Sequence, residues 1–196
     1  MARPRKFDET DVVAAAREEF WTRGYAATSV DDLTNVTGLG KGSLYGAFGD
    51  KHGLFLRALD DYITSAISDV RAQLRDRAYS AYDRLTRHIR GQARAVAADT
   101  SRRGCMMAKS AAELGAVDDD VERAVERAYG EWHAELVDCI KEAQRDGAID
   151  KKHNPQALAT TRRAFMRGQE ALHKGGAKPA QIKAAADEMI SLIPTG

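Results

Sequence analysis

The sequence is poor in several residue types and in long apolar runs, and each shortage excludes a class of protein. Its 196 residues include four prolines and two cysteines, and no apolar run approaches the roughly 20 residues of a membrane-spanning helix. Cys105 and Cys139 are too few for a disulfide framework and suit a reducing compartment. The N-terminal stretch MARPRKFDETDVV lacks the apolar segment of a secretory signal. We therefore expect a cytoplasmic protein with no membrane partner.

The chain also lacks an excess of either sign of charge. The formal net charge is +1, which gives no support for nucleic-acid binding by itself. The basic residues Arg3, Arg5 and Lys6 form an N-terminal arm that can either reach a DNA minor groove or stay disordered. The scarcity of proline and of β-branched runs, together with many alanines and arginines, predicts an all-α fold.

Glycine is abundant in one place, the stretch LGKGSLYGAFGDK at residues 39–51. Its apolar residues have helical spacing, yet each glycine opposes a helix by roughly 1 kcal/mol relative to alanine. A phosphate-binding loop is excluded, because Gly42 follows Lys41 where serine or threonine must hold the metal. The dinucleotide fingerprint fails as well, since Ser43 and Tyr45 stand where its last glycine belongs. The backbone here must lie close to something else.

Apolar periodicity and capping residues predict about nine helices. The first covers residues 8–23 and ends at Gly24, and the second begins at Ser29, with Asp32 three residues later. A four-residue turn, TGLG, leads to a third short helix that is closed by Gly49, and Asp50 can cap the fourth. Further helices are predicted near residues 50–77, 79–98, 104–114, 118–146, 155–173 and 179–193.

Two short helices joined by a glycine turn, after a longer helix, form a helix-turn-helix pattern. In that motif the second helix enters a DNA major groove, where glycine would let the backbone approach closely and the helix N-terminus would face phosphate. Leu44 and Phe48 are expected to face the small core. Gly46 has two interpretations that the sequence leaves open, a close contact with DNA or a close contact with the first helix.

At residues 20–55, FWTRGYAATSVDDLTNVTGLGKGSLYGAFGDKHGLF, the chain resembles the TetR/AcrR family of bacterial transcriptional regulators. The stretch RRGCMMAKSAAELG is similar to a branch whose members respond to electrophiles and oxidants, including the N-ethylmaleimide-responsive repressor. There are departures. Gly40 replaces a usual serine or threonine, Gly46-Ala47 replaces a pair of larger residues, and Gly53 replaces a frequent glutamate.

The resemblance implies a homodimer that binds a palindromic double-stranded operator and releases it when a small-molecule effector binds. It also implies a DNA-binding domain at residues 6–66, with its helix-turn-helix at 29–48, and a ligand-binding and dimerisation domain at 67–196. The candidate DNA-binding residues are Thr28, Ser29, Gly40, Lys41, Gly42, Ser43, Tyr45 and Lys51. Thr28 and Ser29 have a second interpretation, capping of the second helix.

The candidate pocket residues are Cys105, Met106, Tyr129, Trp132, Phe165 and Met166, although such a stripe is often plain core. Cys105 follows two arginines at a predicted helix start, which lowers a thiol pKa and suits a thiol sensor, but most free cysteines are buried packing residues. We predict no cofactor and no metal site. No nucleophile elbow, paired histidines or carboxylate constellation indicates an enzyme, and a helical interaction protein without an effector is the remote alternative.

Overall fold

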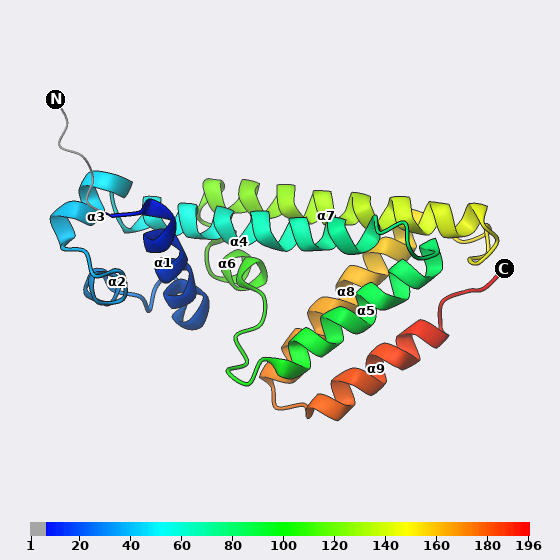
Figure 1. Cartoon of the computed structure of the whole chain (residues 1–196). Coiled ribbons are helices and arrows are strands. Elements are labelled where there is room, and N and C mark those ends of the chain that lie inside the picture. The colour runs from blue at the N-terminus through cyan, green and yellow to red at the C-terminus, as the bar shows by residue number, and fades with distance from the viewer. Residues whose placement is uncertain (1–6) are drawn as a thin grey trace. The chain divides into compact units, whose positions relative to one another are not determined.

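The structure is a computed structural model that describes residues 7–196, so Arg3, Arg5 and Lys6 lie outside the described residues. Within that part the chain forms nine helices and no strand, which confirms the predicted all-α fold (Figure 1). No helix among these residues is long and apolar enough to cross a membrane. The helices are α1 Glu9–Arg23, α2 Val30–Thr37, α3 Lys41–Phe48, α4 Lys51–Leu74, α5 Ala81–Ala98, α6 Met106–Leu114, α7 Asp119–Arg145, α8 Pro155–Lys174 and α9 Pro179–Ser191.

Local capping chemistry sets the helix ends. The Asp8 carboxylate accepts from the Thr10 amide at 2.8 Å and begins α1, which ends at Gly24 with φ of 90°. Ser29 and Asp32 form a complete capping box at the start of α2. Asn154 caps α8 with proline in the first turn. These ends confirm the boundaries that the sequence predicts.

The chain divides into two compact units. One extends to Ser65 and also takes Cys105–Val125, and the other comprises Ala66–Gly104 and Glu126–Gly196. The division falls in α4, between Ser65 and Ala66, and residues 105–125 cluster with the N-terminal helices. The domain limits expected from the sequence, 6–66 and 67–196, stay a prediction.

The core of the first unit is aromatic and aliphatic. Phe20 and Phe55 pack edge to face with ring centroids 5.1 Å apart, and both side chains are fully buried. Leu33 of α2 and Leu44 of α3 are 1% and 3% exposed, so each short helix is fixed by one leucine. Phe48 is only half-buried, so its expected place in the core is met in part.

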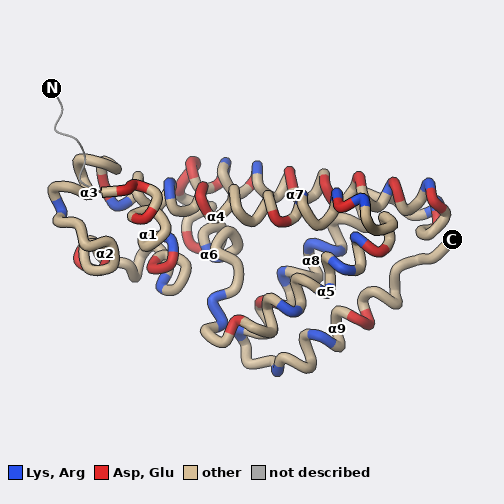
Figure 2. Tube along the Cα trace, viewed as in Figure 1, with Lys and Arg blue, Asp and Glu red and all other residues tan. Residues whose placement is uncertain are grey.

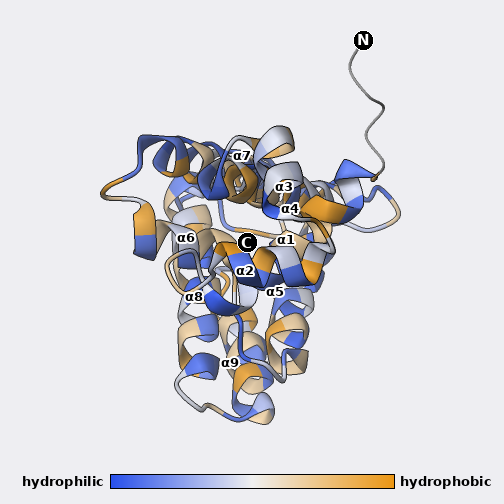
Figure 3. Cartoon of the chain, turned by 90° about the vertical axis from the view of Figure 1, so that its left-hand side faces the viewer, coloured by the Kyte–Doolittle hydropathy of each residue, from blue (hydrophilic) through white to orange (hydrophobic). Residues whose placement is uncertain are grey.

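In the second unit α5 packs against both α8 and α9 (Figure 1). The helices are amphipathic, with apolar and polar segments alternating along α8 and α9 (Figure 3) and both signs of charge interspersed along α7 (Figure 2). Arg84 is buried at the start of α5. Its guanidinium donates to the Leu74 carbonyl at 2.8 Å and pairs with Glu142 at 2.6 Å. A buried charge is tolerated here because both partners compensate it.

Candidate nucleic-acid interface

The predicted helix-turn-helix is formed by α2, the turn around Gly38 and α3. Gly38 has φ of 68° and ψ of 10°, the left-handed conformation that glycine adopts without strain. Leu44 is buried, whereas Lys41, Ser43 and Tyr45 are exposed on α3. The three predicted contact side chains are therefore open to solvent, on a helix that Leu44 holds to the core.

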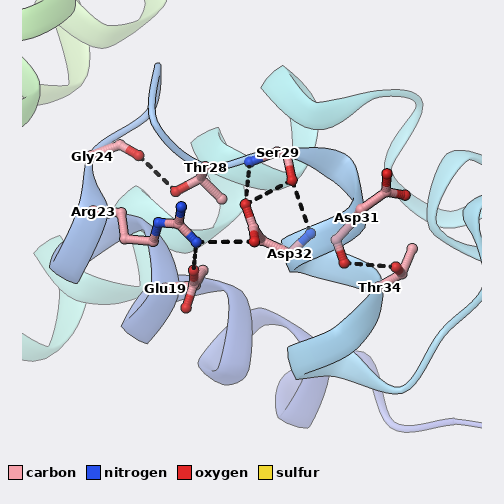
Figure 4. A network of polar contacts seen from close by, with 8 residues as sticks. All are labelled: Glu19, Arg23, Gly24, Thr28, Ser29, Asp31, Asp32 and Thr34. Atoms are coloured by element: carbon pink, nitrogen blue, oxygen red, sulfur yellow. Dashed lines mark hydrogen bonds and ion pairs between the residues drawn. The ribbon is translucent and has the colours of Figure 1, made fainter.

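A polar network fixes the entrance to α2 (Figure 4). The Arg23 guanidinium lies 3.2 Å from Glu19 and 2.9 Å from Asp32. The Asp32 carboxylate also accepts from the amide and the hydroxyl of Ser29, at 2.8 and 2.7 Å. The hydrogen bond from the Ser29 hydroxyl, followed by the one from the Ser29 amide, lowers the pKa of Asp32. Asp32 therefore takes part in this network as an ionised carboxylate. The end of α1 and the start of α2 are thus joined by charge-assisted bonds.

Thr28 and Ser29 have different roles in the structure. Thr28 is fully buried, and its hydroxyl donates to the Gly24 carbonyl at 2.7 Å. It neither caps α2 nor presents its hydroxyl to solvent, so the structure gives no support to a DNA contact by this side chain. Ser29 is the N-cap and is exposed. The sequence could not separate the two, because adjacent threonine and serine are both good caps.

The two candidate lysines are engaged within the protein. The Lys41 ammonium is 2.7 Å from the Asp31 carboxylate, which raises the pKa of Lys41. Both side chains are more than half exposed, so water screens this pair and a phosphate can replace the carboxylate. The Lys51 ammonium lies 4.2 Å from the centroid of the Tyr25 ring, and burial lowers the pKa of Lys51.

At the start of α3 the cap is a bare backbone. Gly40 is the N-cap, and its carbonyl accepts from the amides of Ser43 and Leu44 at 2.9 and 3.1 Å. It has no side chain to offer to the first amides of the helix. The usual serine or threonine of the resembling regulators would satisfy one of these donors, so phosphate is a suitable acceptor here.

Helix α6 holds the end of α1 through two side chains that sequence reasoning missed. The Lys109 ammonium donates to the carbonyls of Trp21 and Thr22, each at 2.9 Å. The Glu113 carboxylate accepts from the amides of Tyr25 and Ala26 at 3.0 and 2.6 Å. We call Lys109 and Glu113 the α6 clamp. Their spacing of four residues placed them on one helix face, but no local signal named their partners.

The candidate pocket residues fall into both units. Cys105 and Met106 belong to the first, and Tyr129, Trp132, Phe165 and Met166 belong to the second.

The Trp132 indole donates to His88 Nε2 at 3.2 Å, and His88 Nδ1 is 2.8 Å from the Gln73 side-chain oxygen. This arrangement suits a neutral imidazole with its proton on Nδ1. Burial lowers the pKa of His88 to about 4.

His88 predicts a loss of stability in acid. Its pKa is about 4 in the folded chain and 6.5 in the unfolded chain, so stability rises with pH between these values. At pH 4.5 the expected loss from this group is about 2 kcal/mol. A His88→Gln variant, whose amide has an acceptor and a donor but does not titrate, should lose correspondingly less stability between pH 7 and 4.5. Urea unfolding at both pH values measures this difference, and equal losses would contradict the prediction.

A notch of about 200 Å³ lies between α5 and α9 of the second unit. Its lining residues are Arg90, Ala93, Arg94, Lys183, Ala186 and Asp187. They include none of the candidate pocket residues, so the position of the effector pocket stays a prediction. Arg90 and Asp187 form an ion pair across the notch at 2.8 Å.

The two cysteines are both buried. Cys139 donates to the Ala81 carbonyl at 3.2 Å, and burial raises the pKa of its thiol to about 11, as expected for a packing residue. Cys105 is the N-cap of α6, which confirms the predicted helix start, and is 7% exposed. That burial fits the packing interpretation better than a solvent-accessible thiol.

Comparison with known proteins agrees with this geometry. ComR, an HTH-type transcriptional repressor of Escherichia coli K12, is 26% identical over 192 residues, which cover 98% of this chain and 91% of ComR. A solved structure of the TetR family regulator CifR, a cysteine mutant bound to a 26-base-pair operator duplex, is 27% identical. It covers 98% of this chain and 100% of its own, with a TM-score of 0.84.

Reduced NemR of E. coli is another structural neighbour, with a TM-score of 0.85 over 95% of this chain and 97% of its own. At 16% identity it shows the fold alone. Residues 12–58 match the family described as bacterial regulatory proteins, tetR family. Residues 81–189 match the tetracyclin repressor-like C-terminal domain. The two matches together cover most of the chain, which therefore belongs to the TetR family of bacterial transcriptional regulators.

Proposed function

We propose that this regulator is a homodimeric repressor that binds a palindromic operator through α3 and is released by a small-molecule effector of the second unit. The observation that carries the proposal is the surface of α3, where Lys41, Ser43 and Tyr45 are exposed and only Leu44 is buried. The operator-bound CifR structure supports the same use of the fold. In this proposal the regulator acts on operator DNA in the cytoplasm and is not an enzyme.

The proposed dimer is supported by an outward apolar stripe. Leu158, Phe165 and Leu172 recur every seven residues along α8, and none of them is buried in the protomer. Leu172 is 60% exposed, and Leu192 at the end of α9 is 68% exposed. Large apolar side chains in this periodic arrangement fit a helical interface between two copies. Phe165, a candidate pocket residue, lies on this stripe.

DNA binding is tested by a mobility-shift assay with the DNA upstream of the gene. Lys41→Ala should weaken binding roughly tenfold and lower the log–log salt slope by about one, because one phosphate contact is lost. Asp31→Asn is the matched variant, since it frees Lys41 from its carboxylate partner. It should bind as tightly as wild type or more tightly. Unchanged binding and slope for Lys41→Ala would remove this lysine from the interface.

A cysteine-based release mechanism is the second candidate. N-ethylmaleimide would then dissociate the wild type from DNA but not a Cys105→Ser variant, with Cys139→Ser as the control. The burial of Cys105 favours the non-covalent effector instead.

A further inference from the structure

Glycine is concentrated on one exposed face of α3. Gly42, Tyr45, Gly46 and Gly49 have the spacing of residues that share one side of a helix. All four are exposed, and the Tyr45 side chain is the only large one among them. Figure 2 draws nearly all of this short helix without charge. The face therefore consists of bare backbone beside one aromatic ring.

The protomer itself does not require glycine at Gly42 or Gly46. Neither has a positive φ, unlike Gly38 and Gly49 of the same motif. A Cβ atom built on either would meet nothing within 4 Å. This excludes a close contact between Gly46 and α1, one of the two interpretations that the sequence left open. Alanine would suit the helix better at both positions.

The need for glycine at Gly42 and Gly46 can then come from a partner that lies against this face of α3. The inference rests on the proposed function, in which the partner is a DNA major groove. That groove is about 12 Å wide, and an α-helix with its side chains is about 10–12 Å across. Beside the Tyr45 ring, the part of this face at Gly42 and Gly46 has no side chain, so the backbone there can lie nearer to the base pairs than in an ordinary recognition helix.

We propose that Gly42 and Gly46 set operator specificity by letting the backbone of α3 lie directly against base-pair edges. Recognition at these positions is then by van der Waals contact, since neither residue has a side chain to donate or accept a hydrogen bond. Small apolar groups match the methyl group of thymine in the major groove. The half-site should therefore contain a thymine opposite Gly46.

The test separates stability from binding. Gly46→Ala should raise Tm by about 2 °C, because alanine favours the helix and meets no atom. The same change should weaken operator binding about tenfold, and Gly46→Leu should weaken it further. Gly130→Ala is the matched control, because Gly130 is also an exposed glycine within a helix with open space around its Cβ. It should raise Tm to a similar extent and leave DNA binding unchanged.

A second arm replaces each thymine of the half-site with uracil, which removes only the methyl group. At one position, replacement of the thymine should lower the operator affinity of the wild type about threefold or more. The same replacement should lower the affinity of Gly46→Ala by no larger factor. Wild-type affinity in Gly46→Ala, or a lowered Tm, would overturn the inference while leaving operator binding established. Failure of the wild type to bind its upstream DNA would instead contradict the proposed function, and this inference with it.

Discussion

Gly53→Ala should destabilise the protein and displace α3, although alanine normally favours a helix. Gly53 lies in the first turn of α4, where its amide donates to the Asp50 carboxylate at 2.7 Å. A Cβ atom on Gly53 would overlap the carbonyl oxygen of Phe48, the last residue of α3. Either α3 or the start of α4 must therefore move to admit a methyl group.

The size of the effect follows from two opposed contributions. Forced overpacking costs about 1–3 kcal/mol, and helix propensity returns about 1 kcal/mol. We expect a net fall in Tm of a few degrees, and a fall in operator affinity of about tenfold or more, because the recognition helix is the part displaced. Gly130→Ala, which adds the same methyl group where there is space, should do neither. A Gly53→Ala protein with wild-type Tm and affinity would show that the junction adjusts freely.

Position 53 shows a packing requirement that the family resemblance does not indicate. Resembling regulators frequently have glutamate at position 53, so the pattern alone gives no reason for glycine there. In this chain the approach of Phe48 to α4 makes glycine a packing requirement.

The caps at Asp8, Ser29 and Asn154 were predictable because each cap and its amides are within a few residues of one another.

Tertiary partners were not predictable in this way. Lys109 and Trp21 are 88 residues apart, and nothing near either residue indicates that they meet. The burial of Thr28 was equally hidden, because its hydroxyl bonds to a carbonyl of the preceding loop instead of capping α2. The α6 clamp supplies a donor to carbonyls at the end of α1, which a helix leaves unsatisfied, and an acceptor to the loop amides that follow. A displacement of α6 would therefore act on the end of α1 and on the loop that leads into the helix-turn-helix.

Leu172→Asp should convert the proposed dimer to monomer and abolish tight operator binding. The Leu172 side chain is 60% exposed in the protomer, so aspartate there costs the isolated fold little. In a dimer it would bury an unpaired carboxylate within an apolar stripe, which is strongly unfavourable. Two linked half-site contacts exceed one by about 100-fold to 10,000-fold in affinity, so operator binding should fall by at least about 100-fold.

Ile190 of α9 is a poorer probe of the dimer than Leu172, because Ile190 is only 8% exposed and lies in the protomer core. Changing it to aspartate would disturb folding and association together. Val117→Asp is the matched control for Leu172→Asp, since Val117 is an apolar residue that is 80% exposed outside α8 and α9. Sedimentation at micromolar concentration should show dimers for wild type and Val117→Asp, and monomers for Leu172→Asp with an unchanged far-UV CD spectrum. A dimeric Leu172→Asp protein with wild-type operator affinity would place the interface away from the stripe formed by Leu158, Phe165 and Leu172.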